Sequence, residues 1–310
     1  MAITTIAQIR PTQILIYCKS DKKRTITEES KANLLQNRAD ENKKYNGEIS
    51  KAAQRKVRRI VENWSYGIEE RAAKARKKDN FNRKLTFITL TLSAQQKHTD
   101  KEIKRLFLDS FLIKIQRDFR VKNYVWKSEL QQNGNIHFHI IADSYIHHKK
   151  IKEVWNTIQE KGGYISSFEQ KYGHKEPNST DVKSVKSSKI VSYYISKYIT
   201  KKDKEIEGRK IEGRVWGCSD NLKNLKYYEK EINYSYYENH EKYNNTDTEF
   251  FAILNEMRKM DEDYRQIEIN EFTEIHLFKR NALELYKCWS VEENIKITDF
   301  YNSQTELLYN

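Results

Sequence analysis

The chain has 310 residues and a net charge of +13 at pH 7, with 33% charged and 37% hydrophobic residues. Its mean hydropathy is -0.91, and no run approaches the roughly 20 apolar residues that cross a bilayer, which excludes an integral membrane protein. A chain of this length has room for one main domain with appendages.

The positive charge is concentrated before residue 219. Residues 219–310 hold 11 Lys and Arg against 19 Asp and Glu, a balance of -8, so residues 1–218 carry +21. A field of this size is typical of a protein that binds the phosphate backbone of a nucleic acid. A merely solvated basic surface is the alternative.

The first 20 residues lack the basic start and apolar region of a secretory signal peptide. Cys18, Cys218 and Cys288 lie far apart with no CxxC pair, which argues against a zinc knuckle and a disulfide framework. The sequence therefore predicts a protein of the reducing cytoplasm.

Residues 22–84 are rich in Lys, Arg, Glu, Asn and Gln and predict exposed basic helices. Such helices either grip DNA or only face solvent, and the sequence does not decide between these two. We expect residues 1–83 to form a basic, largely helical N-terminal extension.

The pattern changes at Leu85. The segment TFITLTLS alternates apolar and threonine residues, which predicts a half-buried strand. Thr99 is placed to cap an amphipathic helix over residues 100–119. Residues 123–130 and 136–143 then predict two strands joined by an Asn-Gly turn, a β-hairpin.

A second helix is expected over residues 148–161, before two glycines, and a further strand near residues 164–168. Strand, helix, hairpin and helix together predict an α+β fold with helices on an antiparallel sheet. Residues 201–214 indicate a charged linker. We expect one domain over residues 84–218 and an acidic, largely helical region over residues 219–310, with a helix at FFAILNEMRKM.

His137 and His139 flank Phe138 on the second hairpin strand, so both imidazoles emerge on the same face. Glu129 lies on the partner strand, near a position that faces one of them. Two nitrogens and one carboxylate suit Mg²⁺ or Mn²⁺ and fit a closed zinc site poorly. A chance histidine pair and an ordinary exposed carboxylate are the alternatives.

Downstream, two tyrosines and two lysines share one spacing in SSKIVSYYISKYITKK: Tyr194, Tyr198, Lys197 and Lys201. On a helix these four side chains gather on one surface. A phenol is a poor nucleophile at its ordinary pKa near 10, but a nearby ammonium and a metal-polarised phosphate make its attack feasible. The alternative is that these tyrosines are core or interface aromatics, as we expect for Tyr193 on another face.

With these motifs in order, the chain resembles the HUH endonuclease superfamily, specifically its rolling-circle replication initiators. TFITLTLS resembles the first motif, NGNIHFHII the second, and YISKYITK the third, closest to the two-tyrosine form of initiators from small icosahedral single-stranded DNA phages. ELQQNGNIHFHI also resembles geminivirus-type initiators, whose third metal ligand is a glutamate where Glu129 stands. The resemblance covers roughly residues 84–202, and GRVWGCS resembles a segment that follows the tyrosines in phage and bacterial relatives.

The resemblance implies a five-stranded antiparallel sheet and a divalent ion, Mg²⁺ or Mn²⁺, held by Glu129, His137 and His139. It also implies that Tyr194 or Tyr198 attacks single-stranded origin DNA, expected in a hairpin, giving a 5′-phosphotyrosine and a free 3′-hydroxyl primer. Lys197 and Lys201 would orient the phosphate. No GxxxxGK[ST] loop is present, so a host helicase and polymerase are expected partners, in a bacterial cytoplasm for a phage or plasmid protein.

Rival functions stay open. A relaxase places its tyrosine before a three-histidine cluster, whereas here the tyrosines follow two histidines. A transposase of the same superfamily shares the motif order but usually has one tyrosine and a shorter chain. A non-catalytic DNA-binding replication or copy-control factor would explain the charge but not the His, Glu and Tyr set, and a plasmid nicking assay with Mn²⁺ separates it from an enzyme.

Overall fold

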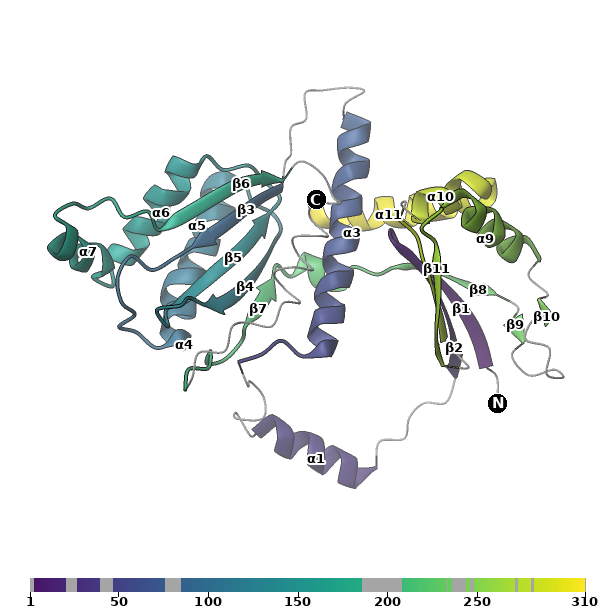
Figure 1. Cartoon of the computed structure of the whole chain (residues 1–310), viewed down its shortest axis with the longest axis horizontal. Coiled ribbons are helices and arrows are strands. Elements are labelled where there is room, and N and C mark those ends of the chain that lie inside the picture. The colour runs from purple at the N-terminus through teal and green to yellow at the C-terminus, as the bar shows by residue number, and fades with distance from the viewer. Residues whose placement is uncertain are drawn as a thin grey trace.

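The computed structural model describes residues 3–20, 27–39, 47–75, 85–185, 208–232, 234–235, 244–245, 248–270, 273–279 and 282–309. They form two five-stranded antiparallel sheets, which lie on either side of the long helix α3 (Lys51–Ala75) in Figure 1. The fold class is therefore α+β, as the sequence predicts. In the described part, no helix has both the length and the apolar character required to cross a bilayer.

The first sheet contains the expected strand and hairpin, in the order β6-β3-β5-β4-β7. Its strands are β3 (Leu85–Leu90), β4 (Tyr124–Leu130), β5 (Ile136–Ala142), β6 (Thr180–Val185) and β7 (Trp216–Cys218). The hairpin turns at Gly134, whose φ of 80° suits a residue without a side chain, and its N–H donates to the Gln131 carbonyl. The hairpin turn thereby fixes how β4 faces β5.

Helices cover one face of this sheet. They are α4 (Asp100–Glu102), which continues through the π-helical turn η1 (Ile103–Leu108) into α5 (Asp109–Phe119), then α6 (His148–Glu160) and α7 (Tyr164–Tyr172). Thr99 caps the first of them in a capping box with Glu102, as expected. Phe111 and Trp155 pack against Phe138 and Ile140 in the core below.

The strand expected near residues 164–168 is wrong, because this segment is helix α7. Two consecutive residues, Tyr164 and Ile165, are buried there, which a helix allows and a half-buried strand does not. The Tyr164 hydroxyl also accepts hydrogen bonds from the backbone N–H groups of Lys97 and His98. Tertiary contacts therefore decide the structure of this segment.

Helix α3 packs on the opposite face of the first sheet. Its Val57, Ile60 and Trp64 contact a cluster that includes Phe87 and Ile141. Every residue from 60 to 67 is buried, so the expectation of exposed basic helices is wrong for this stretch. It holds for the first turns of α3 and for most of the described side chains of α1 (Glu28–Ala39).

The second sheet joins strands from both ends of the chain, in the order β11-β12-β2-β1-β8. Its strands are β1 (Ile3–Ile9), β2 (Gln13–Ser20), β8 (Tyr228–Ile232), β11 (Arg265–Asn270) and β12 (Thr273–Leu277). Short elements flank it: η2 (Asn221–Asn224), β9 (Tyr234–Ser235) and β10 (Asn244–Asn245). The sequence analysis did not anticipate these terminal strands.

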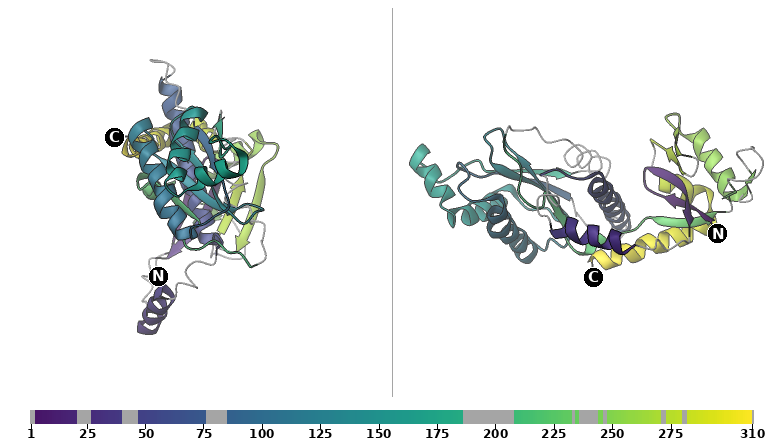
Figure 2. Two further views of the ribbon diagram at one scale, coloured as in Figure 1. Left: turned by 90° about the vertical axis from the view of Figure 1, so that its left-hand side faces the viewer. Right: turned by 90° about the horizontal axis from the view of Figure 1, so that it is seen from below.

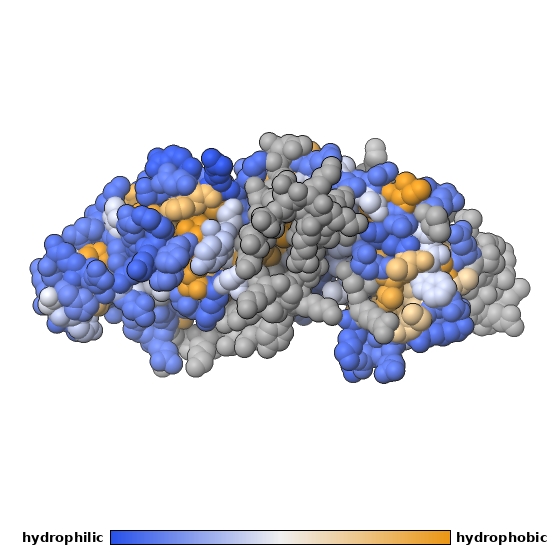
Figure 3. All heavy atoms as spheres, turned by 90° about the horizontal axis from the view of Figure 1, so that it is seen from above, coloured by the Kyte–Doolittle hydropathy of each residue, from blue (hydrophilic) through white to orange (hydrophobic). Residues whose placement is uncertain are grey.

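Three helices complete the second unit: α9 (Thr248–Met260), α10 (Ala282–Trp289) and α11 (Val291–Tyr309). They bury Ile14 and Ile16 of β2 under Phe250 and Tyr286. Helix α9 matches the helix expected at FFAILNEMRKM, and α11 runs from this unit toward α3 (Figure 2). The face in Figure 3 is largely hydrophilic over both units. The boundaries at residues 83 and 218 stay predictions.

Candidate metal centre

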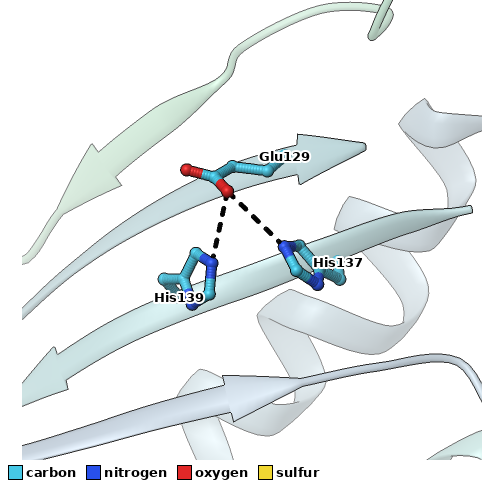
Figure 4. A group of neighbouring side chains, drawn as sticks. All are labelled: Glu129, His137 and His139. Carbon is cyan, nitrogen blue, oxygen red and sulfur yellow. Dashed lines mark ion pairs between the residues drawn. The ribbon is translucent and has the colours of Figure 1, made fainter. Parts of the chain in front are cut away.

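Strand register brings the predicted ligands to one face of the first sheet. Glu129 on β4 pairs directly with His137 on β5, and Lys127 pairs with His139. The intervening Phe138 is buried in the core under α5 and α6. The two histidines and the glutamate therefore emerge on the other face, the one that α3 covers farther along the strands (Figure 4).

The three side chains converge on one carboxylate oxygen. Glu129 Oε2 lies 3.4 Å from His139 Nε2 and 3.7 Å from His137 Nε2, and Figure 4 marks both pairs with dashed lines. One ligand atom from each residue lies within 4.8 Å of the others, so the group could hold a metal ion. The side chains of Glu129, His137 and His139 are 18%, 16% and 10% exposed, which leaves an open side for a substrate.

Neighbouring residues fix His139 and leave His137 unsatisfied. The Nδ1 atom of His139 lies 3.2 Å from the Thr89 hydroxyl, and its ring stacks on Phe87. A bond at Nδ1 directs Nε2 toward Glu129, the usual arrangement of a metal-binding histidine. Both ring nitrogens of His137 are buried and have no hydrogen-bond partner in the described part of the chain. A bound ion would satisfy one of them, so the donor set fits a metal.

The charge states also suit metal binding. Burial alone would raise the pKa of Glu129, but the two imidazoles and the Lys127 ammonium hold that pKa below its ordinary value. Burial lowers the pKa of His139, although Glu129 partly opposes this shift. At neutral pH the pair is therefore an ionised carboxylate and a neutral imidazole, the forms that bind a metal ion.

Residues 85–203 match a protein family described as replication-associated protein, of the ORF2 group. The match spans less than half of the chain, and it includes the three candidate ligands and the four residues of the tyrosine motif. It supports a role as a replication initiator and DNA as a partner. Searches of curated proteins and of solved structures each found no significant match.

The four residues of the tyrosine motif, Tyr194, Tyr198, Lys197 and Lys201, lie outside the described residues. The structure therefore neither brings them to the metal group nor separates them from it. The described chain before them ends with β6 at one edge of the first sheet, and β7 after them forms the other edge.

The chain after the tyrosine motif is anchored from Arg209 onward. Arg209 donates hydrogen bonds to the buried carboxylate of Asp100, which also accepts from the Glu212 N–H, and Ile211 enters the core. Burial would raise the pKa of Asp100, but the bonds from Arg209 and its neighbours lower it overall. The described end of the expected charged linker, residues 208–214, is thus held against α4.

Sequence reasoning missed Lys127. Its side chain is only 2% exposed, and Nζ donates to Glu129 Oε1 at 3.0 Å. The signal was present, because alternation on β4 places Lys127 on the same face as Glu129. A lysine in a strand is ordinarily read as solvent-facing, which is why the pattern alone did not single it out.

Proposed function

We propose that this chain is a rolling-circle replication initiator of the HUH type, which nicks single-stranded DNA at a replication origin. The observation that carries this proposal is the convergence of Glu129, His137 and His139 on one sheet face, within the segment that matches a replication-associated family. The order of the motifs, with the tyrosines after the histidine pair, supports the same function.

In this proposal Glu129, His137 and His139 hold Mg²⁺ or Mn²⁺. Nitrogen and carboxylate donors in a partly open site leave coordination positions for phosphate oxygens. The ion, when bound, supplies Lewis-acid polarisation of the scissile phosphate. Thr89 keeps His139 in the tautomer whose Nε2 faces the site.

Tyr194 or Tyr198 attacks the phosphorus in this mechanism. A bond forms between the phenolic oxygen and phosphorus, the bond to the 3′-oxygen breaks, and the phenolic proton is balanced by protonation of the leaving 3′-oxygen. The product is a 5′-phosphotyrosine and a 3′-hydroxyl that primes synthesis. Lys197 and Lys201 stabilise the developing negative charge, and the second tyrosine rejoins the strand after one round.

The surrounding system follows from this chemistry. An initiator that leaves a 3′-hydroxyl requires a polymerase to extend it and a helicase to open the duplex, and we propose that the host supplies both. The origin would present its scissile strand unpaired, in a hairpin. The site of action is the cytoplasm of a bacterial host, where a phage or plasmid replicon resides.

Covalent trapping tests the proposal. The full chain is incubated with Mn²⁺ and suicide oligonucleotides tiled across the source replicon, and the adduct is mapped by peptide mass spectrometry. We expect the adduct on Tyr194 or Tyr198, its loss in the double Tyr→Phe variant, and its retention in the control Tyr193→Phe. An adduct on a tyrosine elsewhere in the chain, or none with the wild-type protein, would refute the mechanism.

A further inference from the structure

Lys127 and the two histidines divide the Glu129 carboxylate between them. Lys127 Nζ lies 3.0 Å from Oε1, while Oε2 faces the imidazoles of His137 and His139. The carboxylate thus has one oxygen held by an ammonium and the other directed into the candidate metal group. Held in this way, Glu129 offers a metal ion one oxygen only.

The sheet encloses the stem of Lys127. In the strand register, Lys127 pairs with His139 on one side and with Trp216 of β7 on the other. With only 2% of the side chain exposed, Lys127 is shielded from a DNA phosphate in the open site. An effect of this ammonium on the substrate must therefore pass through Glu129 or through its electrostatic field.

The charges of the group can be counted. Two neutral imidazoles add nothing, the Glu129 carboxylate adds one negative charge, and the Lys127 ammonium cancels it. A divalent ion in this group would keep a local net charge near +2, whereas a group without the lysine would reduce it to about +1. Burial strengthens the difference, because charges in a partly desolvated site are weakly screened.

We propose that Lys127 is a positioning residue that sets the net charge of the metal centre. It lowers the affinity of the site for a free divalent ion and raises the attraction of the loaded site for an anionic phosphodiester. This inference rests on the proposed metal centre. It predicts two effects of opposite sign on removal of the lysine, which a residue needed only for packing would not produce.

The test is Lys127→Met in the full chain, because methionine replaces a buried lysine with a neutral side chain of similar length. Mn²⁺ affinity is measured without DNA, from the electron paramagnetic resonance signal of free Mn²⁺. We expect about tenfold tighter binding, from removal of one nearby positive charge. Mn²⁺-dependent nicking of a supercoiled plasmid should become slower in the same variant.

Two controls accompany it. Lys127→Arg keeps the charge and should leave both readouts near wild type, while Lys149→Met removes an exposed lysine on α6, across the sheet, and should change neither. Thermal unfolding by circular dichroism checks that each variant folds. Unchanged or weaker Mn²⁺ binding by a folded Lys127→Met variant would overturn the inference.

The same measurements separate this inference from the proposed function. If the wild-type chain binds Mn²⁺ and His137→Ala abolishes binding while Lys127→Met changes nothing, only the role of Lys127 is wrong. If the wild-type chain binds no Mn²⁺, the metal centre is wrong and the role of Lys127 falls with it.

Discussion

His137 and His139 differ in what surrounds them, and their alanine variants should differ accordingly. His139→Ala removes a ring stacked on Phe87 and a contact with Thr89, which should cost about 2–3 kcal/mol of unfolding free energy. His137→Ala removes two buried nitrogens without partners, so its stability should stay within about 1 kcal/mol of wild type. Urea denaturation measures both.

Both variants should nevertheless lose Mn²⁺ binding, because each removes one of three ligands. DNA binding should survive in both, since phosphate contacts do not depend on the metal. A titration of Mn²⁺ by calorimetry separates the two roles. Retained Mn²⁺ binding in either folded variant would remove that histidine from the ligand set.

His276 on β12 should make the protein sensitive to acid. It is 1% exposed, and burial together with the nearby Arg258 lowers its pKa to about 3. The unfolded chain binds this proton more tightly, so the contribution of neutral His276 is present near pH 7 and is lost as the pH falls toward 3. At about 1.4 kcal/mol per unit, the full effect approaches roughly 4–5 kcal/mol.

His276→Gln isolates this contribution. The unfolding free energies of wild type and variant are compared by urea denaturation at pH 7 and pH 4.5. The wild type should lose several kcal/mol more than the variant on acidification, because only the wild type has the buried imidazole. Parallel pH profiles would show that another group controls the acid response.

The ligand set could be predicted from the sequence because its geometry is local. Alternation places His137 and His139 on one face, and counting across the Asn133–Gly134 turn places Glu129 near them. Burial of Lys127 could not be predicted, since it depends partly on Trp216, which pairs with it from almost 90 residues farther along the chain.

The same distinction holds for whole elements. The Thr99 cap, the hairpin and α6 were predictable from neighbouring residues, whereas β1 and β2 pair with strands more than 200 residues away, as in Thr5 with Ile232 and Tyr17 with Thr273. Helix α7 was mistaken for a strand because Tyr164 and Phe168 resemble part of an alternating pattern. The contacts that fix Tyr164 come from Lys97 and His98.

Helix α3 carries the clearest prediction at the scale of an element. Its first turns expose four basic side chains on the side of the sheet that bears the metal group: Lys51, Arg55, Lys56 and Arg58. If these side chains contact phosphates, changing all four to Gln should make the slope of log K against log salt shallower by up to about 3, at roughly 0.7 per contact with single-stranded DNA. Fluorescence anisotropy at several salt concentrations measures the slope.

A matched control removes the same charge from the other face. Lysines in or next to α6 lie on the helix-covered side of the sheet: Lys149, Lys150, Lys152 and Lys161. Changing these four to Gln should leave the salt slope unchanged. An equal loss of slope in both variants would indicate nonspecific attraction to a basic protein rather than a DNA contact on α3.

At the scale of the whole molecule, α3 is the element that both sheets share. Val57 and Trp64 pack on the first sheet, whereas Tyr66 donates to Glu284 of α10 and Gly67 lies so close to Thr305 of α11 that a side chain there would clash. Glu62 accepts a hydrogen bond from Tyr227, which precedes β8. A buried helix therefore connects the two units.

This arrangement predicts that residues 84–218 alone fold poorly. Without α3, the cluster of Leu85, Phe87, Val125 and Ile141 would lose its cover. Uncovering each such side chain costs about 1.5–3 kcal/mol, and four together approach the roughly 5–15 kcal/mol that stabilises a typical domain. A fragment of residues 47–227 restores α3 and also the buried Leu222 and Leu225.

The two fragments should therefore differ in stability and in exposed apolar surface. We expect residues 47–227 to unfold cooperatively on heating, as followed by circular dichroism, and to bind a hydrophobic dye weakly. Residues 84–218 should melt at a lower temperature, or without a clear transition, and bind the dye strongly because the α3 face of the sheet is open to water. Equal melting temperatures and equal dye binding would show that the first sheet is a self-sufficient domain and that α3 belongs functionally to the second unit alone.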